Sequence, residues 1–110
     1  MNMVWRGVMP ATTTAFDENL NIDHAFVAKH AVWLVDNGCT AIVAPGSLGE
    51  SATLSFDEKV AHWSTLIAAV GDRVPVVAAI ASLSTAEAVA LAKRAADTGC
   101  SGRRACKPRR

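Results

Sequence analysis

The stretch Ala41-Ile42-Val43-Ala44-Pro45-Gly46-Ser47-Leu48-Gly49-Glu50-Ser51 decides the fold. Its first four residues form a short apolar run typical of a buried strand. Two glycines three positions apart then let the backbone turn tightly and approach a ligand closely. Helical periodicity resumes only near Asp57. The sequence therefore predicts a loop at the carboxyl end of a strand and before a helix, which is where α/β proteins bind ligands.

The same alternation of strand and helix extends on both sides of this loop. Ser55 with Glu58, and Ser84 with Glu87, have the spacing of a capping box, which marks the start of a helix. The apolar run over 76–81 does not alternate with polar residues, as expected when both faces of a parallel sheet are covered. In chain order we predict strand 4–14, helix 23–37, strand 40–44, helix 55–70, strand 76–81 and helix 84–98.

The first helix has signals at both of its ends. Asp23 is placed to cap its amino terminus, and Gly38 suits the left-handed conformation that ends a helix. Between them, apolar and aromatic residues recur at helical spacing, so we expect that face to pack inward. The face expected to be buried holds Phe26, His30, Trp33 and Leu34.

Composition limits the class of protein. The 110 residues suffice for one small domain, and no run of eighteen apolar residues would form a transmembrane helix. The first sixteen residues lack the long apolar centre of a signal peptide. The three cysteines form no C-x-x-C pair, so we expect reduced thiols in a cytoplasmic protein. The histidines have no metal-ligand spacing, and no metal site is expected.

Residues 7 to about 102 resemble the amino-terminal part of the dihydrodipicolinate synthase and N-acetylneuraminate lyase family, whose members are class I Schiff-base lyases on a (β/α)8 barrel. The resemblance implies an α/β fold in which residues 1–102 form the first three βα units of a TIM barrel. The barrel is incomplete and is followed by a short basic tail over 103–110. The residues that carry the resemblance are Gly7–Pro10, Phe16-Asp17, Asn37-Gly38, Gly46–Leu54, Glu58-Lys59 and Val74–Ala78.

The resemblance also implies a mechanism. In this family a lysine amine attacks the ketone of a 2-oxo acid such as pyruvate, and the imine that forms is an electron sink for lyase or aldolase chemistry. Ser47 matches the position of a proton-relay hydroxyl. Gly46, Ser47, Leu48 and Gly49 match the loop that holds the substrate carboxylate. Residue 48 is usually a second hydroxyl residue, whereas Leu48 offers only its backbone N–H, and Glu50 is expected to brace the loop.

The family places its Schiff-base lysine and its catalytic tyrosine beyond the third helix. This chain has no tyrosine. Lys29, Lys59 and Lys93 fall within predicted helices, on the outer ring of a barrel, and Lys107 lies in the tail. We therefore expect no Schiff-base lysine and no activity in this chain alone.

Two classes of function remain open. The first is a truncated fragment of a 2-oxo-acid lyase, whose full-length relatives act on a small substrate without a cofactor and are commonly homotetramers. Within the family, Leu48 makes a 2-keto-3-deoxy-acid aldolase or dehydratase an alternative to dihydrodipicolinate synthase. The second class is a catalytically dead small carboxylate-binding protein. Neither class implies a nucleic-acid or membrane partner.

The tail breaks an internal repeat. Asp97-Thr98-Gly99-Cys100 repeats Asp36-Asn37-Gly38-Cys39, after which a strand follows. Residues 103–110, however, hold five of the eleven basic side chains and none of the ten acidic ones. Burying unpaired cations costs several kcal/mol each. We therefore predict that 103–110 forms no strand, is disordered and packs against nothing, as expected of a segment translated out of frame; a sequencing error and a true short gene product are the alternatives.

Overall fold

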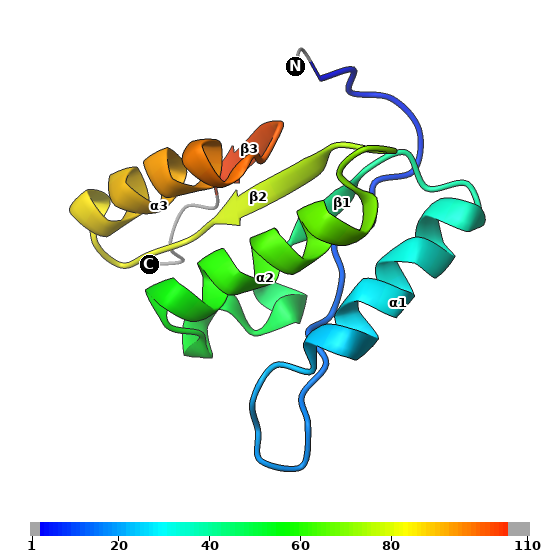
Figure 1. The fold of residues 1–110 in the computed structure, drawn as a ribbon. Coiled ribbons are helices and arrows are strands. Elements are labelled where there is room, and N and C mark those ends of the chain that lie inside the picture. The colour runs from blue at the N-terminus through cyan, green and yellow to red at the C-terminus, as the bar shows by residue number, and fades with distance from the viewer. Residues whose placement is uncertain (1–2, 106–110) are drawn as a thin grey trace.

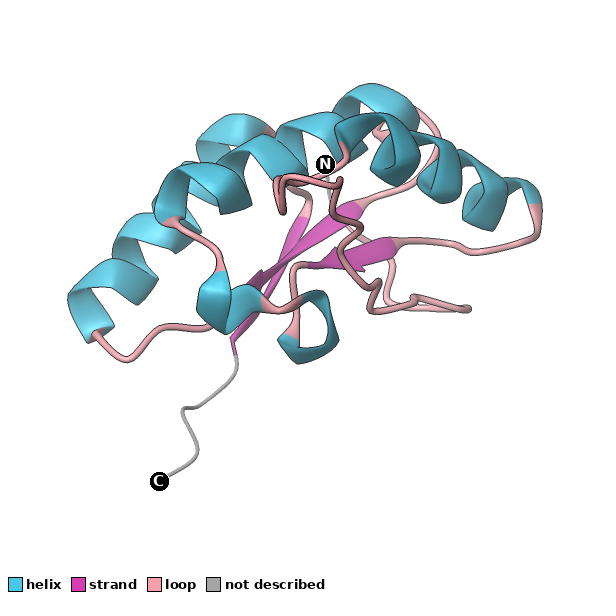
Figure 2. Cartoon of the chain, turned by 90° about the horizontal axis from the view of Figure 1, so that it is seen from below, coloured by secondary structure: helices cyan, strands magenta, loops and turns pink. Residues whose placement is uncertain are grey.

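The computed structural model describes residues 3–105, in which helices and parallel strands alternate (Figure 1). The strands form one parallel sheet in the order β1-β2-β3. All three helices cover the same face of that sheet (Figure 2). The elements are α1 (His24–Asp36), β1 (Ile42–Ala44), the 3-10 turns η1 (Ser47–Gly49) and η2 (Ser51–Thr53), α2 (Phe56–Val70), β2 (Val76–Ile80), α3 (Thr85–Thr98) and β3 (Gly102–Ala105).

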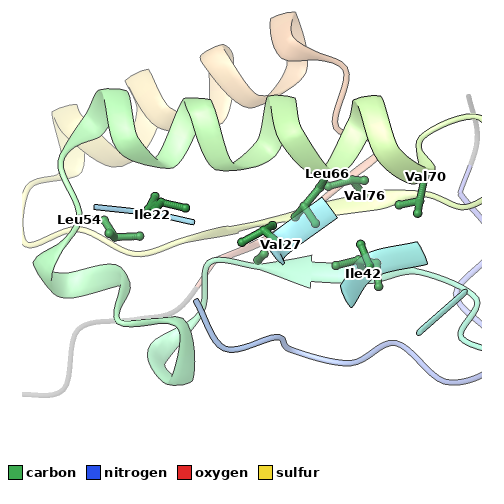
Figure 3. Packing of buried hydrophobic residues seen from close by; sticks show 9 residues of the cluster. Ile22, Val27, Ile42, Leu54, Leu66, Val70 and Val76 are labelled. Atoms are coloured by element: carbon green, nitrogen blue, oxygen red, sulfur yellow. The ribbon is translucent and has the colours of Figure 1, made fainter. Parts of the chain in front are cut away.

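Both faces of strands β1 and β2 are apolar and covered, as the continuous run over 76–81 predicts. On one face Ile42 and Val76 pack beneath α1 and α2 with Leu66, in the cluster that Figure 3 shows. On the other face Ala41, Val43, Val77 and Ala79 are buried, and partly buried Met3 and Met9 pack against them. In the described chain the amino-terminal segment thus covers the face that carries no helix.

The predicted helix boundaries are confirmed, and the capping contacts predicted for α1 and α2 are present. Asp23 accepts a hydrogen bond of 3.0 Å from the Phe26 N–H at the start of α1. Ser55 and Glu58 bond each other in both directions, at 3.1 and 2.9 Å, and the backbone bond from Ser55 lowers the pKa of Glu58. At α1's other end, Gly38 has the expected positive φ of 100°.

The capping box predicted for α3 forms only in part. The Ser84 hydroxyl accepts a 3.3 Å hydrogen bond from the Glu87 N–H. The Ser84 N–H, however, donates to the Ser82 hydroxyl at 3.2 Å instead of to the Glu87 carboxylate. A serine two residues upstream therefore takes the place of the return bond, and α3 still starts where the spacing predicts.

The strand predicted over 4–14 is not a regular strand. Ala11 forms a single parallel bridge with Val43 of β1, flanked by bonds from the Thr12 N–H to the Val43 carbonyl (3.1 Å) and from the Val43 N–H to the Pro10 carbonyl (2.9 Å). The segment lies beside β1, where a preceding strand belongs. Gly7, at φ 93°, and Pro10, which has no N–H, limit its regular pairing.

The inward face predicted for α1 is wrong for Phe26 and Trp33, whereas Leu34 is partly buried and packs against the core as predicted. Val27 and Ala31 are its buried residues, whereas the side chains of Phe26 and Trp33 are 53% and 59% exposed. Two neighbouring rows of side chains on this helix are apolar: a smaller row with Val27 and Ala31, and a larger row with Phe26 and Trp33. The sequence predicts the larger row inside. The smaller row packs inward because α1 lies close to α2 and the sheet, where small side chains permit the contact. The larger row is left on the surface.

The prediction that 103–110 forms no strand is wrong for residues 103–105. Strand β3 pairs in parallel with β2, and Arg103 is in register with Ala78. The burial argument assumed a strand covered on all sides, whereas β3 is an edge of the described sheet, and edge strands accommodate charged residues. Residues 106–110 lie outside the described chain. No helix among the described residues is long and apolar enough to span a membrane.

Candidate functional site

The loop after β1 folds as two short 3-10 turns joined at Glu50. Glu50 adopts the left-handed conformation, with φ 58° and ψ 35°, between η1 and η2. The carbonyl of Gly46 accepts hydrogen bonds from the N–H groups of Gly49 (3.0 Å) and Ser51 (3.2 Å), so it closes the first turn. The Glu50 carbonyl accepts from the Thr53 N–H and hydroxyl, both at 2.9 Å. The loop therefore has a defined shape.

Three consecutive backbone N–H groups in this loop form no hydrogen bond with any described residue. Among the hydrogen bonds of the described chain, none uses the N–H of Gly46, Ser47 or Leu48. They stand at the carboxyl end of β1 and at the start of a turn, where unpaired N–H groups favour an anion. The arrangement can therefore accept a carboxylate through the backbone alone.

Side chains of the predicted site residues point mostly to solvent. Ser47 and Glu50 are exposed, and Leu48 has 71% of its side chain exposed, whereas Gly49 is buried. The Glu50 carboxylate has no hydrogen bond or ion pair among those of the described residues. Glu50 thus shapes the loop through its backbone conformation and its carbonyl.

Two buried side chains outside the loop hold its base. The Thr14 hydroxyl donates a hydrogen bond of 2.7 Å to the carbonyl of Gly49. The indole N–H of Trp63, on α2, donates a bond of the same length to the carbonyl of Ala44, the last residue of β1. A Cβ at Gly49 would lie 3.1 Å from both the Thr14 hydroxyl and the Thr12 carbonyl oxygen, a tight contact that favours glycine at this position. The loop is fixed from the amino-terminal segment and from the helix layer.

The sequence predicts Lys59 on the outer ring of helices. Lys59 does lie on α2, but it is buried and does not face the outer surface of that layer. Only 4% of it is exposed, and its ammonium lies 3.5 Å from the carbonyl of Ala81, one residue past β2. The hydroxyl of Ser51, in η2, is also buried and has no hydrogen-bond partner among the described residues. The buried Lys59 amine thus lies near the carboxyl ends of the strands, the same end of the sheet as the loop after β1.

The sequence does not predict the roles of Thr14 and Trp63 in holding the loop. Neither has a local signal, because Thr14 is 35 positions from Gly49 and Trp63 is 19 positions from Ala44. The role of Trp63 could have been found only from a general rule about buried tryptophans. A buried tryptophan usually finds a partner for its N–H, and the nearest unpaired carbonyls lie where a strand ends.

Replacing Thr14 by valine is expected to loosen the loop. The change keeps the side-chain shape but leaves the buried Gly49 carbonyl without its 2.7 Å donor, which costs about 1–3 kcal/mol of unfolding free energy. Denaturant unfolding and the amide NMR shifts of residues 46–51 measure both effects. Thr13→Val is the matched control, because Thr13 is exposed one position away. Equal effects of the two changes would refute the anchoring role.

Comparison with protein families matches residues 4–108 to the dihydrodipicolinate synthetase family. Among curated relatives, 4-hydroxy-tetrahydrodipicolinate synthase of Natronomonas pharaonis is 46% identical over 96 residues. Those residues are 87% of this chain but 32% of that protein. The chain thus spans about a third of the length of the curated relatives it matches.

Solved structures show the same family likeness and the same partial coverage. Dihydrodipicolinate synthase of Bacillus anthracis superposes with a TM-score of 0.88 at 38% identity, covering 97% of this chain and 38% of that one. N-acetylneuraminate lyase of Mycoplasma synoviae superposes with a TM-score of 0.88 at 30% identity, covering 96% of this chain and 37% of that one. The likeness extends over nearly all of the present chain and over little more than a third of either enzyme.

Proposed function

Because the chain belongs to the dihydrodipicolinate synthetase family, we propose that it is the amino-terminal part of a Schiff-base lyase acting on 2-oxo acids. Segment 8–14 with α1, β1 with α2, and β2 with α3 correspond in this proposal to the first three βα units of a TIM barrel. Its contribution to the site is the loop over 46–49, which holds the substrate carboxylate. The observation that carries the proposal is that the N–H groups of Gly46, Ser47 and Leu48 form no hydrogen bond within the described part of the chain.

The chemistry of the loop suits this role. Carboxylate oxygens accept hydrogen bonds, and backbone N–H groups at a turn offer donors that need no reorganisation when the ligand binds. The Ser47 hydroxyl, exposed beside them, is placed to pass a proton between the substrate and a group supplied by the rest of the barrel. The imine-forming lysine would also come from that remainder.

We expect the chain to bind pyruvate weakly without forming an imine. Addition of pyruvate should shift the amide NMR signals of residues 46–48, whereas the neutral analogue pyruvamide should not, because it lacks the carboxylate. Reduction with borohydride followed by intact mass measurement should leave the protein mass unchanged.

Two results would contradict this expectation. Unshifted loop amides at saturating pyruvate would remove the carboxylate site. A stoichiometric pyruvyl adduct would show that this chain does carry an imine-forming lysine. Lys59 is the one to test by peptide mapping and by Lys59→Arg, since its amine is buried near the carboxyl end of β2.

Leu48 is proposed to set substrate preference within the family. Its side chain is 71% exposed at the loop and cannot hydrogen-bond, so a 2-keto-3-deoxy-acid aldolase or dehydratase stands as an alternative to dihydrodipicolinate synthase. In a chimera carrying residues 7–102 on the rest of the Natronomonas pharaonis relative, Leu48→Thr should change the ratio of kcat/KM between two 2-oxo acids roughly tenfold. The chimera's unfolding midpoint should hardly move. A ratio that stays constant within error would place residue 48 outside the pocket.

A further inference from the structure

The end of helix α1 carries a chemically labile dipeptide, Asn37-Gly38. Asparagine is one of the thermolabile residues of proteins, because its side-chain amide can react with the backbone nitrogen of the next residue. Glycine hinders that reaction least, since it has no side chain beside the attacking nitrogen. Both residues are exposed, and a Cβ built at Gly38 would meet no atom within 4 Å. Neither burial nor crowding therefore shields the two reacting groups.

The two other asparagines of the described chain differ in the residue that follows each of them. Asn19 and Asn21 are also exposed, so exposure alone does not distinguish the three. Leu20 follows Asn19, and its N–H already donates a hydrogen bond of 3.0 Å. Ile22 follows Asn21 and belongs to the core, with 8% of it exposed. In both cases a branched side chain stands beside the nitrogen that would have to attack.

The intact cap of α1 holds the dipeptide away from reaction. Asn37 has φ −99° and ψ 18°, and its side-chain amide donates a 2.8 Å hydrogen bond to the Trp33 carbonyl. The Gly38 N–H donates to the Val35 carbonyl at 3.1 Å. Ring closure requires that both bonds open and that ψ of Asn37 rotates until the Gly38 nitrogen faces Cγ. Because helix ends fray more easily than helix interiors, opening of this last turn is sufficient.

We propose that Asn37 is a site of spontaneous deamidation in the folded chain, with water as the only co-reactant. The Gly38 nitrogen attacks Cγ of Asn37, and a new bond between these two atoms forms as the bond from Cγ to Nδ2 breaks. The side-chain nitrogen leaves as ammonia and carries away the proton of the attacking nitrogen. Water then opens the cyclic imide at one of its two carbonyls. One opening gives aspartate, and the other gives isoaspartate, whose backbone runs through the side-chain carbon.

The product is unfavourable at this place in the fold. Deamidation removes the donor to the Trp33 carbonyl and adds a negative charge at the carboxyl end of α1, where the helix dipole favours cations. Asp36 already lies there, and Arg73 is already paired with it at 2.8 Å. Isoaspartate also lengthens the backbone in the connection from α1 to β1 (Figure 1). In the modified chain the amide hydrogens of Gly38 and Cys39 should therefore exchange at least tenfold faster.

The test follows the mass of each asparagine-containing peptide. The full chain is incubated for days at mildly alkaline pH, where the attacking nitrogen loses its proton more readily, and is then digested and analysed by mass spectrometry. We expect the peptide with Asn37 to gain the mass increment of an amide-to-acid exchange at least tenfold faster than the peptide with Asn19 and Asn21. Methylation by an isoaspartyl methyltransferase identifies the isoaspartate. Asn37→Gln, whose amide lies one carbon farther from the backbone, should remove the increment.

A second variant distinguishes local opening from global unfolding. Trp63→Phe lowers the stability of the whole chain, but Trp63 packs with β2 and α3 and not with the end of α1. When opening is fast relative to the reaction, the rate follows the population of the open form, so the rate at Asn37 should stay within twofold of the parent's.

Three outcomes would overturn the proposal. A rate at Asn37 no greater than that at Asn19 and Asn21 would show that the cap protects the dipeptide. A rate that rises in step with the stability lost in Trp63→Phe would place the reaction in the unfolded chain. Unchanged hydrogen exchange at Gly38 and Cys39 in the modified chain would show that the reaction does not weaken the end of α1.

Discussion

Replacing Trp63 by alanine is expected to remove a large part of the chain's free energy of unfolding. Its side chain is fully buried, in a cluster with Ala78 of β2 and Leu91 of α3, and truncating such a tryptophan costs about 3–5 kcal/mol of unfolding free energy. The change also leaves the carbonyl of Ala44 without its 2.7 Å donor. A domain of this size has a total of only about 5–15 kcal/mol. Denaturant unfolding followed by circular dichroism measures the loss.

Two further variants separate packing from hydrogen bonding. Trp63→Phe keeps most of the apolar contact and removes the donor, so we expect a loss of about 1–3 kcal/mol and altered NMR shifts in the loop after β1. Trp33→Ala, at a side chain 59% exposed, should change stability by less than about 0.5 kcal/mol. If Trp33→Ala were as damaging as Trp63→Ala, the account of which tryptophan supports the core would be wrong.

Stability is expected to fall steeply between pH 6.5 and pH 4 because of His62. The ring is fully buried on α2, and neither nitrogen has a hydrogen-bond partner among the described residues. Burial, with a smaller contribution from the charge of His24, lowers the pKa of His62 from 6.5 to about 4. The unfolded chain therefore takes up a proton below pH 6.5, while the folded chain does not do so until about pH 4. The free energy of unfolding therefore falls by about 3 kcal/mol between pH 6.5 and pH 4. Above pH 6.5 the stabilisation from the neutral His62 ring is fully present.

A variant pair isolates this contribution from that of the carboxylates. His62→Leu removes the titrating group and suits the apolar site, so its unfolding free energy should vary much less between pH 7 and pH 4 than that of the parent chain. Trp33→Ala, on the exposed row of α1, removes no titrating group and should keep the parent's pH dependence. Parallel pH profiles for the parent and His62→Leu would show that the buried ring is not responsible.

The sequence predicted the ends of the helices better than their faces. Caps are local, so Asp23, Ser55 and Gly38 could be identified from a few neighbouring residues, and all three act as expected. Which row of α1 turns inward depends on how closely a second helix approaches. The sequence of α1 alone holds no such information, and the row with Trp33 was wrongly placed inside.

The candidate loop was located from its glycines, but its supports were not. Thr14 and Trp63 act through bonds between segments far apart in the sequence, and only the fold brings them to the loop. The same holds for Lys59, whose position on a helix suggested the surface. Strand β3 was missed for another reason: side-chain charge dominated the prediction, although a single neighbouring strand suffices to pair its backbone.

Covering both faces of the sheet has a consequence for how its strands find their alignment. Where one face meets water, sliding a strand by one residue exposes its apolar set, and this opposes the error. All residues of β1 and β2 are apolar and buried, so a one-residue slip would exchange one apolar face for another. The bond from Trp63 to the Ala44 carbonyl lies at a fixed point on β1, and a slip of about 3.3 Å would break it. Burial of apolar side chains alone does not distinguish the native register of β1 from registers shifted by one residue. The hydrogen bond from Trp63 at the end of the strand therefore selects the native register.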